Sequence, residues 1–300
     1  FYDKANKFSL MKDTDGNYYT YEEYKTLIKD NQTDKDGNLI YLYSNNLEEQ
    51  YSYIDAAKNK GYNVLLMDGQ LDVAMVSMLE HKLEKCRFTR VDSDVIDRLI
   101  AKDEPKGEEL ANEKKDILSS VFRSQLPSMN KVEFNVETQA MGETGAPIMI
   151  TQSEYMRRMK EMSHIQAGMS FYGEMPDMFN VVLNSDHKLV KQVLEDANSA
   201  CSEELLPIET SIATLNFEQS EMQKKQQGMK YDEIPQADKD ALSEVEKKLA
   251  DEKSKKDAVL GKYAGGNKVI RQLVDLALLQ NNMLKGEALT NFVKRSIEMI

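Results

Sequence analysis

Tryptophan is absent from this chain of 300 residues, and cysteine, histidine and proline are scarce, with two, three and six residues. Cys86 and Cys201 lie far apart and outside any Cys-x-x-Cys spacing, which disfavours a disulfide framework and favours a reducing compartment. His81, His164 and His187 belong to no zinc-binding spacing. The residue types that most often hold a metal are therefore few and scattered, and we expect no metal site.

Long apolar runs are also missing. No stretch approaches the roughly 18 residues that a membrane span needs, and the first residues show no signal-peptide pattern. We therefore expect no membrane partner and a cytoplasmic location. The chain begins at Phe1 rather than at a methionine, so we expect it to be part of a longer protein.

Positive charge is in the minority, and the net charge is −12. This charge argues against a nucleic-acid partner, which would need a broad basic surface. With 41% hydrophobic and 30% charged residues, the composition is typical of a globular protein with a charged surface. The length alone suggests about two domains.

Signatures of catalysis are missing as well: the chain contains no GxGxxG, GxxxxGK[ST], GxSxG or HExxH motif. In "DTDG" and "DKDG" the glycine comes two positions too early for a calcium loop, so both are predicted turns. Lys85 and Arg87 could lower the thiol pKa of Cys86. No acid or histidine stands directly beside that cysteine in the sequence, and a structural role is favoured. We expect no catalytic residue, and an enzyme with a cryptic carboxylate site is the least favoured alternative.

Residues 1–104 have the pattern of a small α/β layer. Short helices around a turn are predicted for residues 1–30. Three strands alternate with helices after that, which indicates parallel pairing. The strands are predicted at 39–44, 62–68 and 86–91, and the helices at about 47–60 and 70–80. The charged, Pro- and Gly-containing stretch at 101–109 places a domain boundary between residues 104 and 105.

Residues 105–300 predict an α+β domain that ends in helices. A helix is predicted at 108–123, strands at 131–138, 146–151 and 179–184, and a helix at 187–197. A long insertion follows at 203–260. Between Asn216 and Lys256 it holds ten acidic and nine basic residues, a balance typical of a salt-bridged helical hairpin.

The stretch Thr151–Met169 contains four of the chain's 17 methionines and predicts an amphipathic helix. Its apolar arc consists of Tyr155, Met156, Met159, Met162, Ile165 and Met169, with Arg158 intruding. The opposite side consists of Arg157, Lys160, Glu161 and His164. Methionine in place of leucine suits a surface that accepts many partners. Burial in the core, a binding face and an oligomer contact are the three alternatives.

Residues 267–300 are the most apolar part and predict two helices that are apolar over more than half their circumference. Such helices need more than one partner surface, so a bundle completed by a second copy of the chain is predicted. The alternative is packing back onto residues 108–200. The predicted interface residues are Ile270, Leu273, Val274, Ala277, Leu278, Leu284, Leu289, Phe292, Val293 and Ile297.

Several of these stretches together resemble the ninety-kilodalton heat-shock chaperone family in its bacterial form, HtpG. They are "FYDKANKFSLMKDTDGNYYTYEEYK", "YLYSNNLEEQYSYIDAAKNKGYNVLLMDGQLDVAMVSMLE", "VVLNSDHKLVKQV" and "QLVDLALLQNNMLKGEALTNFVKRSIEMI". The resemblance covers nearly the whole chain. It implies that residues 1–104 are the end of the family's middle domain and residues 105–300 its dimerisation domain.

The resemblance also implies roles for particular residues. Thr151–Met169 occupies the place of the family's exposed amphipathic helix, which contacts client proteins, and Met75 and Met78 lie where members offer further client contacts. The last two helices would form a homodimer. The family's ATP-binding domain is absent, so we expect no ATP, magnesium or ATP hydrolysis in this chain. The insertion at 203–260 is longer than the resemblance implies.

Two functions remain open. The chain is either the dimerising, client-binding part of a chaperone or a structural or regulatory dimeric scaffold with its methionine-rich helix buried in its own core. The exposure of Met156, Met159 and Met162 distinguishes the two.

Overall fold

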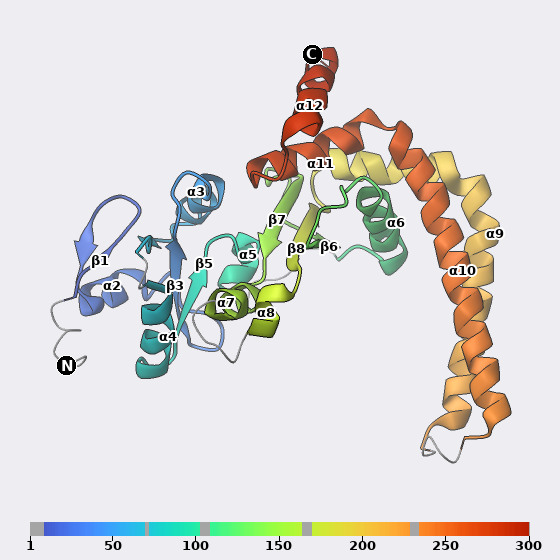
Figure 1. The fold of residues 1–300 in the computed structure, drawn as a ribbon, viewed down its shortest axis with the longest axis horizontal. Coiled ribbons are helices and arrows are strands. Elements are labelled where there is room, and N and C mark those ends of the chain that lie inside the picture. Colours follow the sequence, from blue (N-terminus) through green and yellow to red (C-terminus); the bar gives the residue numbers. More distant parts are fainter. Residues whose placement is uncertain (1–8, 70–71, 103–108, 164–169, 229–233, 300) are drawn as a thin grey trace.

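The computed structural model describes residues 9–69, 72–102, 109–163, 170–228 and 234–299 (Figure 1). The predicted boundary at residues 104 and 105, and the predicted contact residues Ile165 and Met169, lie outside this part of the chain. The helices and strands are, in chain order, β1 (Met11–Lys12), β2 (Tyr18–Tyr19), α2 (Tyr21–Ile28), β3 (Leu39–Ser44), α3 (Tyr51–Asn59), β4 (Val64–Leu66), α4 (Asp72–Lys82), β5 (Cys86–Arg90), α5 (Ile96–Leu99), α6 (Asn112–Arg123), β6 (Val132–Gln139), β7 (Ile148–Gln152), α7 (Glu154–Ser163), α8 (Ser170–Glu174), β8 (Asp177–Asn184), α9 (Lys188–Gln226), α10 (Gln236–Gly266), α11 (Lys268–Gln280) and α12 (Gly286–Met299).

The first sheet has the order β4-β3-β5, and both strand pairs are parallel, as predicted. The central strand β3 is buried on both faces because successive side chains point to opposite sides. Tyr41 and Tyr43 join a core with α2 and α4, whereas Ile40 and Leu42 join a second core with α3 and α5. Helices therefore cover both faces of this sheet.

The prediction of short helices for residues 1–30 was partly wrong. In residues 9–30, the described part of this segment, β1 and β2 form a short antiparallel hairpin, and the helix α2 begins at Tyr21. The turn is fixed by Asp13, whose Oδ1 accepts the backbone N–H of Asn17 at 2.9 Å. Gly16 supplies the positive φ of 87° that this turn needs.

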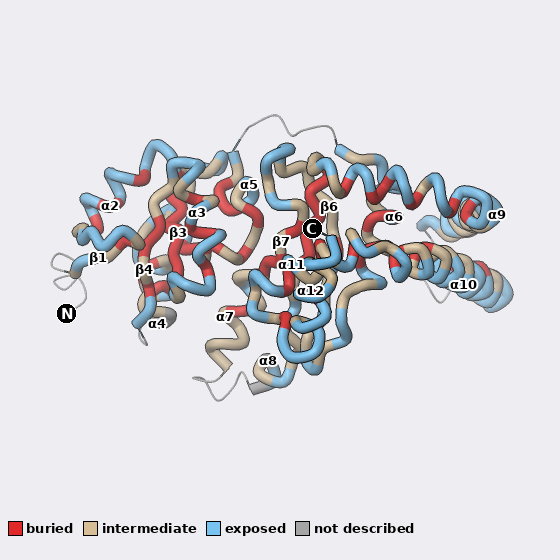
Figure 2. Tube along the Cα trace, turned by 90° about the horizontal axis from the view of Figure 1, so that it is seen from above, coloured by how far each residue is buried: buried red, intermediate tan, exposed pale blue. Residues whose placement is uncertain are grey.

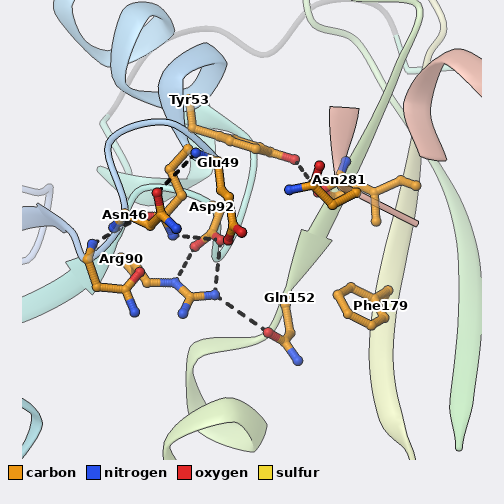
Figure 3. A pocket seen from close by; sticks show the side chains of 12 residues that line it. Asn46, Glu49, Tyr53, Arg90, Asp92, Gln152, Phe179 and Asn281 are labelled. Carbon is orange, nitrogen blue, oxygen red and sulfur yellow. Dashed lines mark hydrogen bonds and ion pairs between the residues drawn. The ribbon is translucent and has the colours of Figure 1, made fainter. Parts of the chain in front are cut away.

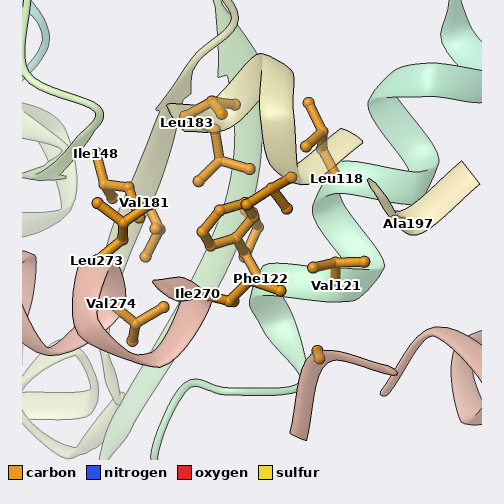
Figure 4. Packing of buried hydrophobic residues seen from close by; sticks show 14 of the residues in the cluster. Leu118, Val121, Phe122, Ile148, Val181, Leu183, Ala197, Ile270, Leu273 and Val274 are labelled. Carbon is orange, nitrogen blue, oxygen red and sulfur yellow. The ribbon is translucent and has the colours of Figure 1, made fainter. Parts of the chain in front are cut away.

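The second sheet has the order β6-β8-β7, with β8 parallel to β6 and antiparallel to β7. The predicted turn joins β6 to β7, but these two strands do not pair with each other. Helices α6, α9 and α11 pack on one face and form the largest core, around Phe122, Leu183 and Ile270 (Figure 4). From the other face, Met149 packs against the core of the first sheet. The two sheets therefore share packed side chains.

The insertion forms a long helical hairpin of α9 and α10 that projects from the two sheets (Figure 1). Buried Val245 and Leu249, and the ion pair between Lys256 and Glu209 at 2.9 Å, join the two helices. The helices predicted at 187–197 and from 203 onward are a single 39-residue helix, which was not expected. The residues between them are compatible with helix, and Pro207 does not end it.

The terminal helices α11 and α12 require a correction to the predicted dimer interface. Seven of its ten residues are buried in the core of their own chain, together with the second sheet and α6. They are Ile270, Leu273, Val274, Ala277, Leu278, Leu284 and Phe292. A side chain that is already buried has almost no area left for contact with a partner. These seven residues therefore follow the alternative prediction, in which the terminal helices pack onto residues 108–200 of their own chain. Periodicity marks an apolar face but does not say which chain covers it.

We expect Phe122→Ala to lower the free energy of unfolding by about 3–5 kcal/mol, because this ring is fully buried in the largest core. Phe217→Ala is the matched control, since that ring is 67% exposed on α9, and its effect should stay within about 0.5 kcal/mol. Urea unfolding followed by circular dichroism measures both. Equal losses in the two variants would contradict the placement of this core.

Candidate functional site

Helix α7 docks on the first sheet through its charged side. Arg157 is 5% exposed and is the buried residue of this helix, although it lies on the polar side of the helical wheel, opposite the apolar arc. Glu154, Arg157 and Arg158 all reach across to residues of the first sheet and of α4. The helical wheel could not show that this polar side is docked, because the partner of Arg157 on the first sheet, Tyr43, lies 114 residues earlier in the chain.

Arg157 is held by three groups. Its guanidinium donates to Tyr43 Oη at 2.6 Å, to Glu154 Oε1 at 2.6 Å and to Glu161 Oε1 at 2.5 Å. Buried guanidinium groups need such partners, because removal from water costs several kcal/mol per ion. The tyrosine lies on β3, so this cluster joins α7 directly to the first sheet.

Arg158 makes a second set of contacts beside the first. It donates to Glu80 Oε2 at 2.6 Å, to the carbonyl oxygen of Phe88 at 2.5 Å and to Glu154 Oε1 at 2.6 Å. Glu154 Oε2 accepts the backbone N–H of Arg90 at 3.2 Å. We call Tyr43, Glu80, Glu154, Arg157, Arg158 and Glu161 the ion-pair network.

The network shifts the pKa values of its members. Burial would raise the pKa of Glu154, but the charges of Arg157 and Arg158 outweigh burial and hold that pKa below its usual value. Burial raises the pKa of Tyr43 to about 12, with a further contribution from Glu154. At neutral pH, Glu154 is therefore ionised and Tyr43 carries its proton.

The apolar arc of α7 lies on the side away from these contacts, since at 100° per residue Met159 stands opposite Glu154, Arg157 and Glu161. Tyr155 is 62% exposed, and Met156, Met159 and Met162 are half-buried. In Figure 2 most of α7 has the colour of intermediate burial. None of the four belongs to the three hydrophobic cores of the described residues. We call Tyr155, Met156, Met159 and Met162 the methionine face.

Helix α8 packs beside α7. A side-chain Cβ at Gly173 would come within 2.9 Å of Ser163 Oγ, so glycine permits this close approach. Phe171 of α8 is 72% exposed. A second large apolar side chain is therefore exposed on the helix next to the methionine face.

Met75 and Met78, the other predicted client contacts, lie on α4. Both are half-buried and pack against the core of the first sheet beside Val76 and Leu79. Their surroundings therefore indicate a packing role and leave only part of each side chain accessible.

The remaining dimer candidates form a stripe on α12. Leu289 is half-buried, Val293 is 47% exposed and Ile297 is 70% exposed. Successive members are four residues apart, so they share one face of the helix. Leu276 and Leu279 of α11 are exposed as well.

Other kinds of site find little support. Burial raises the pKa of Cys86 to about 12, which fits the structural role favoured above. Within the described ranges, no three or more His, Cys, Asp or Glu residues are grouped as metal ligands would be. Nor does any helix in those ranges have the length and apolarity to cross a membrane.

We expect Arg157→Ala to release α7 from the first sheet, because it leaves Tyr43 and Glu161 without their buried cation. Breaking a buried pair costs about 3–5 kcal/mol, so amide exchange within α7 should become roughly a hundredfold to several thousandfold faster. Hydrogen exchange with mass spectrometry measures this rate. Arg123→Ala, at an exposed arginine of α6, is the control and should leave α7 unchanged. Unaltered protection of α7 in Arg157→Ala would contradict the role of the network.

Known proteins similar to this chain match it over its whole length. No family model matches it. The chain is 68% identical over 300 residues to the chaperone protein HtpG of Bacteroides fragilis and 67% identical to that of Bacteroides thetaiotaomicron. It is 44% identical over 300 residues to the chaperone protein HtpG of Porphyromonas gingivalis. All 300 residues are matched, and they span 44% of the length of each relative. In sequence, the whole chain is therefore similar to the C-terminal part of bacterial chaperone proteins named HtpG.

Proposed function

We propose that this chain carries the client-contacting and dimer-forming part of a molecular chaperone. The main support for this proposal is the orientation of α7. Its charged side is docked on the first sheet, and the methionine face lies outside the hydrophobic cores. The similarity to proteins named chaperone protein HtpG supports the same function.

The chemistry of the methionine face suits partly folded proteins. Methionine side chains are flexible and polarizable, so they adapt to apolar segments of different shapes. Tyr155 and the nearby Phe171 add exposed aromatic area. Such a surface would bind many sequences weakly and would release them when their apolar segments become buried on folding.

The alternative function is a structural or regulatory scaffold. It requires that Met156, Met159 and Met162 be buried in their own chain. All three are half-buried and lie outside the described cores, which favours the client-binding function.

A second copy of the chain is the proposed partner of the terminal helices. Leu289, Val293 and Ile297 would form the contact on α12, with Leu276 and Leu279 contributing from α11. The exposed fractions of these side chains support the proposal, because that apolar area remains to be buried. The division into domains at residues 104 and 105 belongs to the same proposal.

Further parts of the proposal concern the whole protein. In this family ATP and magnesium would bind outside the matched segment, so we infer that residues 1–300 neither hold these cofactors nor hydrolyse ATP. We also propose a cytoplasmic location, with no nucleic-acid or membrane partner, in line with the net charge of −12.

We expect the combined substitutions Met156→Ser, Met159→Ser and Met162→Ser to weaken binding of a permanently unfolded, fluorescently labelled protein. The loss of partly buried apolar contacts amounts to about 2 kcal/mol, or roughly thirtyfold in affinity. Fluorescence anisotropy measures the affinity, and Met222→Ser with Met299→Ser, on α9 and α12, is the control. Equal affinity of the triple variant and the unsubstituted chain would refute the client-binding role.

We expect Ile297→Glu, and Val293→Glu separately, to shift the chain from dimer to monomer, because each places a charge in the proposed contact. Asn291→Glu adds the same charge on the opposite side of α12 and should leave the dimer intact. Sedimentation equilibrium measures the mass. Point variants serve better than a chain cut near residue 266, because the cut also removes Ile270 and Leu273 from the core. A dimer that persists in both glutamate variants would contradict this interface.

A further inference from the structure

A cavity of about 360 Å³ lies between the two sheets (Figure 3). Asn46 and Gln50, after β3, and Arg90 and Asp92, at the end of β5, line one side. The other side consists of Gln152 of β7, Phe179 of β8, and Asn281 and Asn282 after α11. The volume falls in the range of small-molecule sites, roughly 300–1,000 Å³.

Relative to the first sheet, the cavity lies where open α/β sheets commonly bind ligands. The chain runs from β3 outward to β4 and then crosses back to β5 on the other side of β3, so the strand order reverses at the β3–β5 pair. The cavity lies outside the carboxyl ends of these two strands. Ligands of parallel sheets bind in the crevice at such a reversal.

The walls of the cavity are held in place by hydrogen bonds. Gln50 Oε1 accepts from Ser44 Oγ at 2.8 Å, and its Nε2 donates to Asp92 Oδ2 at 2.8 Å. Across the cavity, Tyr53 Oη donates to Asn281 Oδ1 at 3.1 Å, as Figure 3 shows. The cavity is therefore shaped before any ligand enters, which lowers the entropic cost of binding.

The charges of the walls disfavour an anion. Arg90 is the one cation among the residues that line this cavity, and it is already bound to Asp92 through Nε at 2.5 Å and Nη2 at 2.9 Å. Glu49 adds a negative charge without a cationic partner among the described residues. A phosphate or carboxylate would therefore meet net negative charge.

Carboxamides dominate the rest of the lining. They belong to Asn45, Asn46, Gln50, Gln152, Asn281 and Asn282. A carboxamide both donates and accepts hydrogen bonds, as hydroxyl and amide groups of a ligand also do. In the described part of the chain, the side-chain amides of Asn45 and Asn282 have no protein partner, and the ring of Phe179 offers an apolar surface beside them.

We propose that this cavity binds a small, neutral molecule rich in hydroxyl groups, of the size of a monosaccharide, cyclic polyol or nucleoside. Such a ligand would contact carboxamides from both sides at once. Because the two sides belong to different sheets, binding would hold the sheets in the present arrangement and oppose their separation. This inference does not depend on the proposed chaperone function.

The test uses saturation-transfer NMR and isothermal titration with glucose, myo-inositol and adenosine, and with adenosine monophosphate and inorganic phosphate as anionic counterparts. We expect at least one neutral compound to bind, and adenosine monophosphate to bind more weakly than adenosine. Tighter binding of glucose and myo-inositol would identify a sugar or polyol as the ligand class, and tighter binding of adenosine would identify a nucleoside. The absence of binding by all three neutral compounds, or tighter binding of the phosphorylated compound, would overturn the proposal.

Two variants test whether the ligand binds in this cavity. Asn45→Phe fills the rim at an exposed residue whose side chain makes no described hydrogen bond, so the chain should fold and binding should weaken at least about tenfold. Gln227→Phe makes a matched change at the far end of α9 and should bind as the unsubstituted chain does. Unchanged affinity in Asn45→Phe would show that the ligand binds elsewhere and would also overturn the proposal.

Discussion

The burial of Arg157 beside Glu154 is the constraint on which the arrangement of this protein depends. A guanidinium leaves water only where anions and hydrogen-bond acceptors surround it, and Tyr43, Glu154 and Glu161 supply them. Satisfying these groups fixes which side of α7 faces the first sheet. The methionine face then has to turn away from that sheet, so a polar interaction determines where an apolar surface is exposed.

The contacts between α7 and the first sheet are part of a larger set of contacts that joins the two sheets. Beside the ion-pair network, Gln152 N–H donates to the carbonyl of Asp92 at 3.1 Å, and the hydroxyl hydrogen of Tyr53 is shared between the carbonyl of Ile150 and Asn281 Oδ1. Arg98 pairs with Glu137 on the other side. A movement of one sheet against the other would break these contacts together, which would also change the orientation of α7 and the shape of the cavity at β3 and β5.

Much of this fold follows from local pattern, and the parts that do not follow involve distant partners. The near-continuous apolar run in 62–68 and the alternation in 131–138 predict β4 and β6 correctly, because period and burial are local properties. The wheel placed Arg157 opposite the apolar arc but could not show its burial, because nothing near it in sequence indicates the contact with Tyr43. It also could not assign Ile270 and Leu273 to their own core rather than to a partner. Arg158 inside the apolar arc was the one visible sign of the network.

The methionine face is accessible to solvent while α7 is docked on the first sheet. Brief oxidation by dilute hydrogen peroxide, with mass spectrometry of each methionine, tests it within a single sample. Buried Met11 and Met67 are internal references for protection, and exposed Met299 for reactivity. We predict that Met156, Met159 and Met162 oxidise faster than both buried references. Protection of all three equal to that of Met11 and Met67 would contradict it.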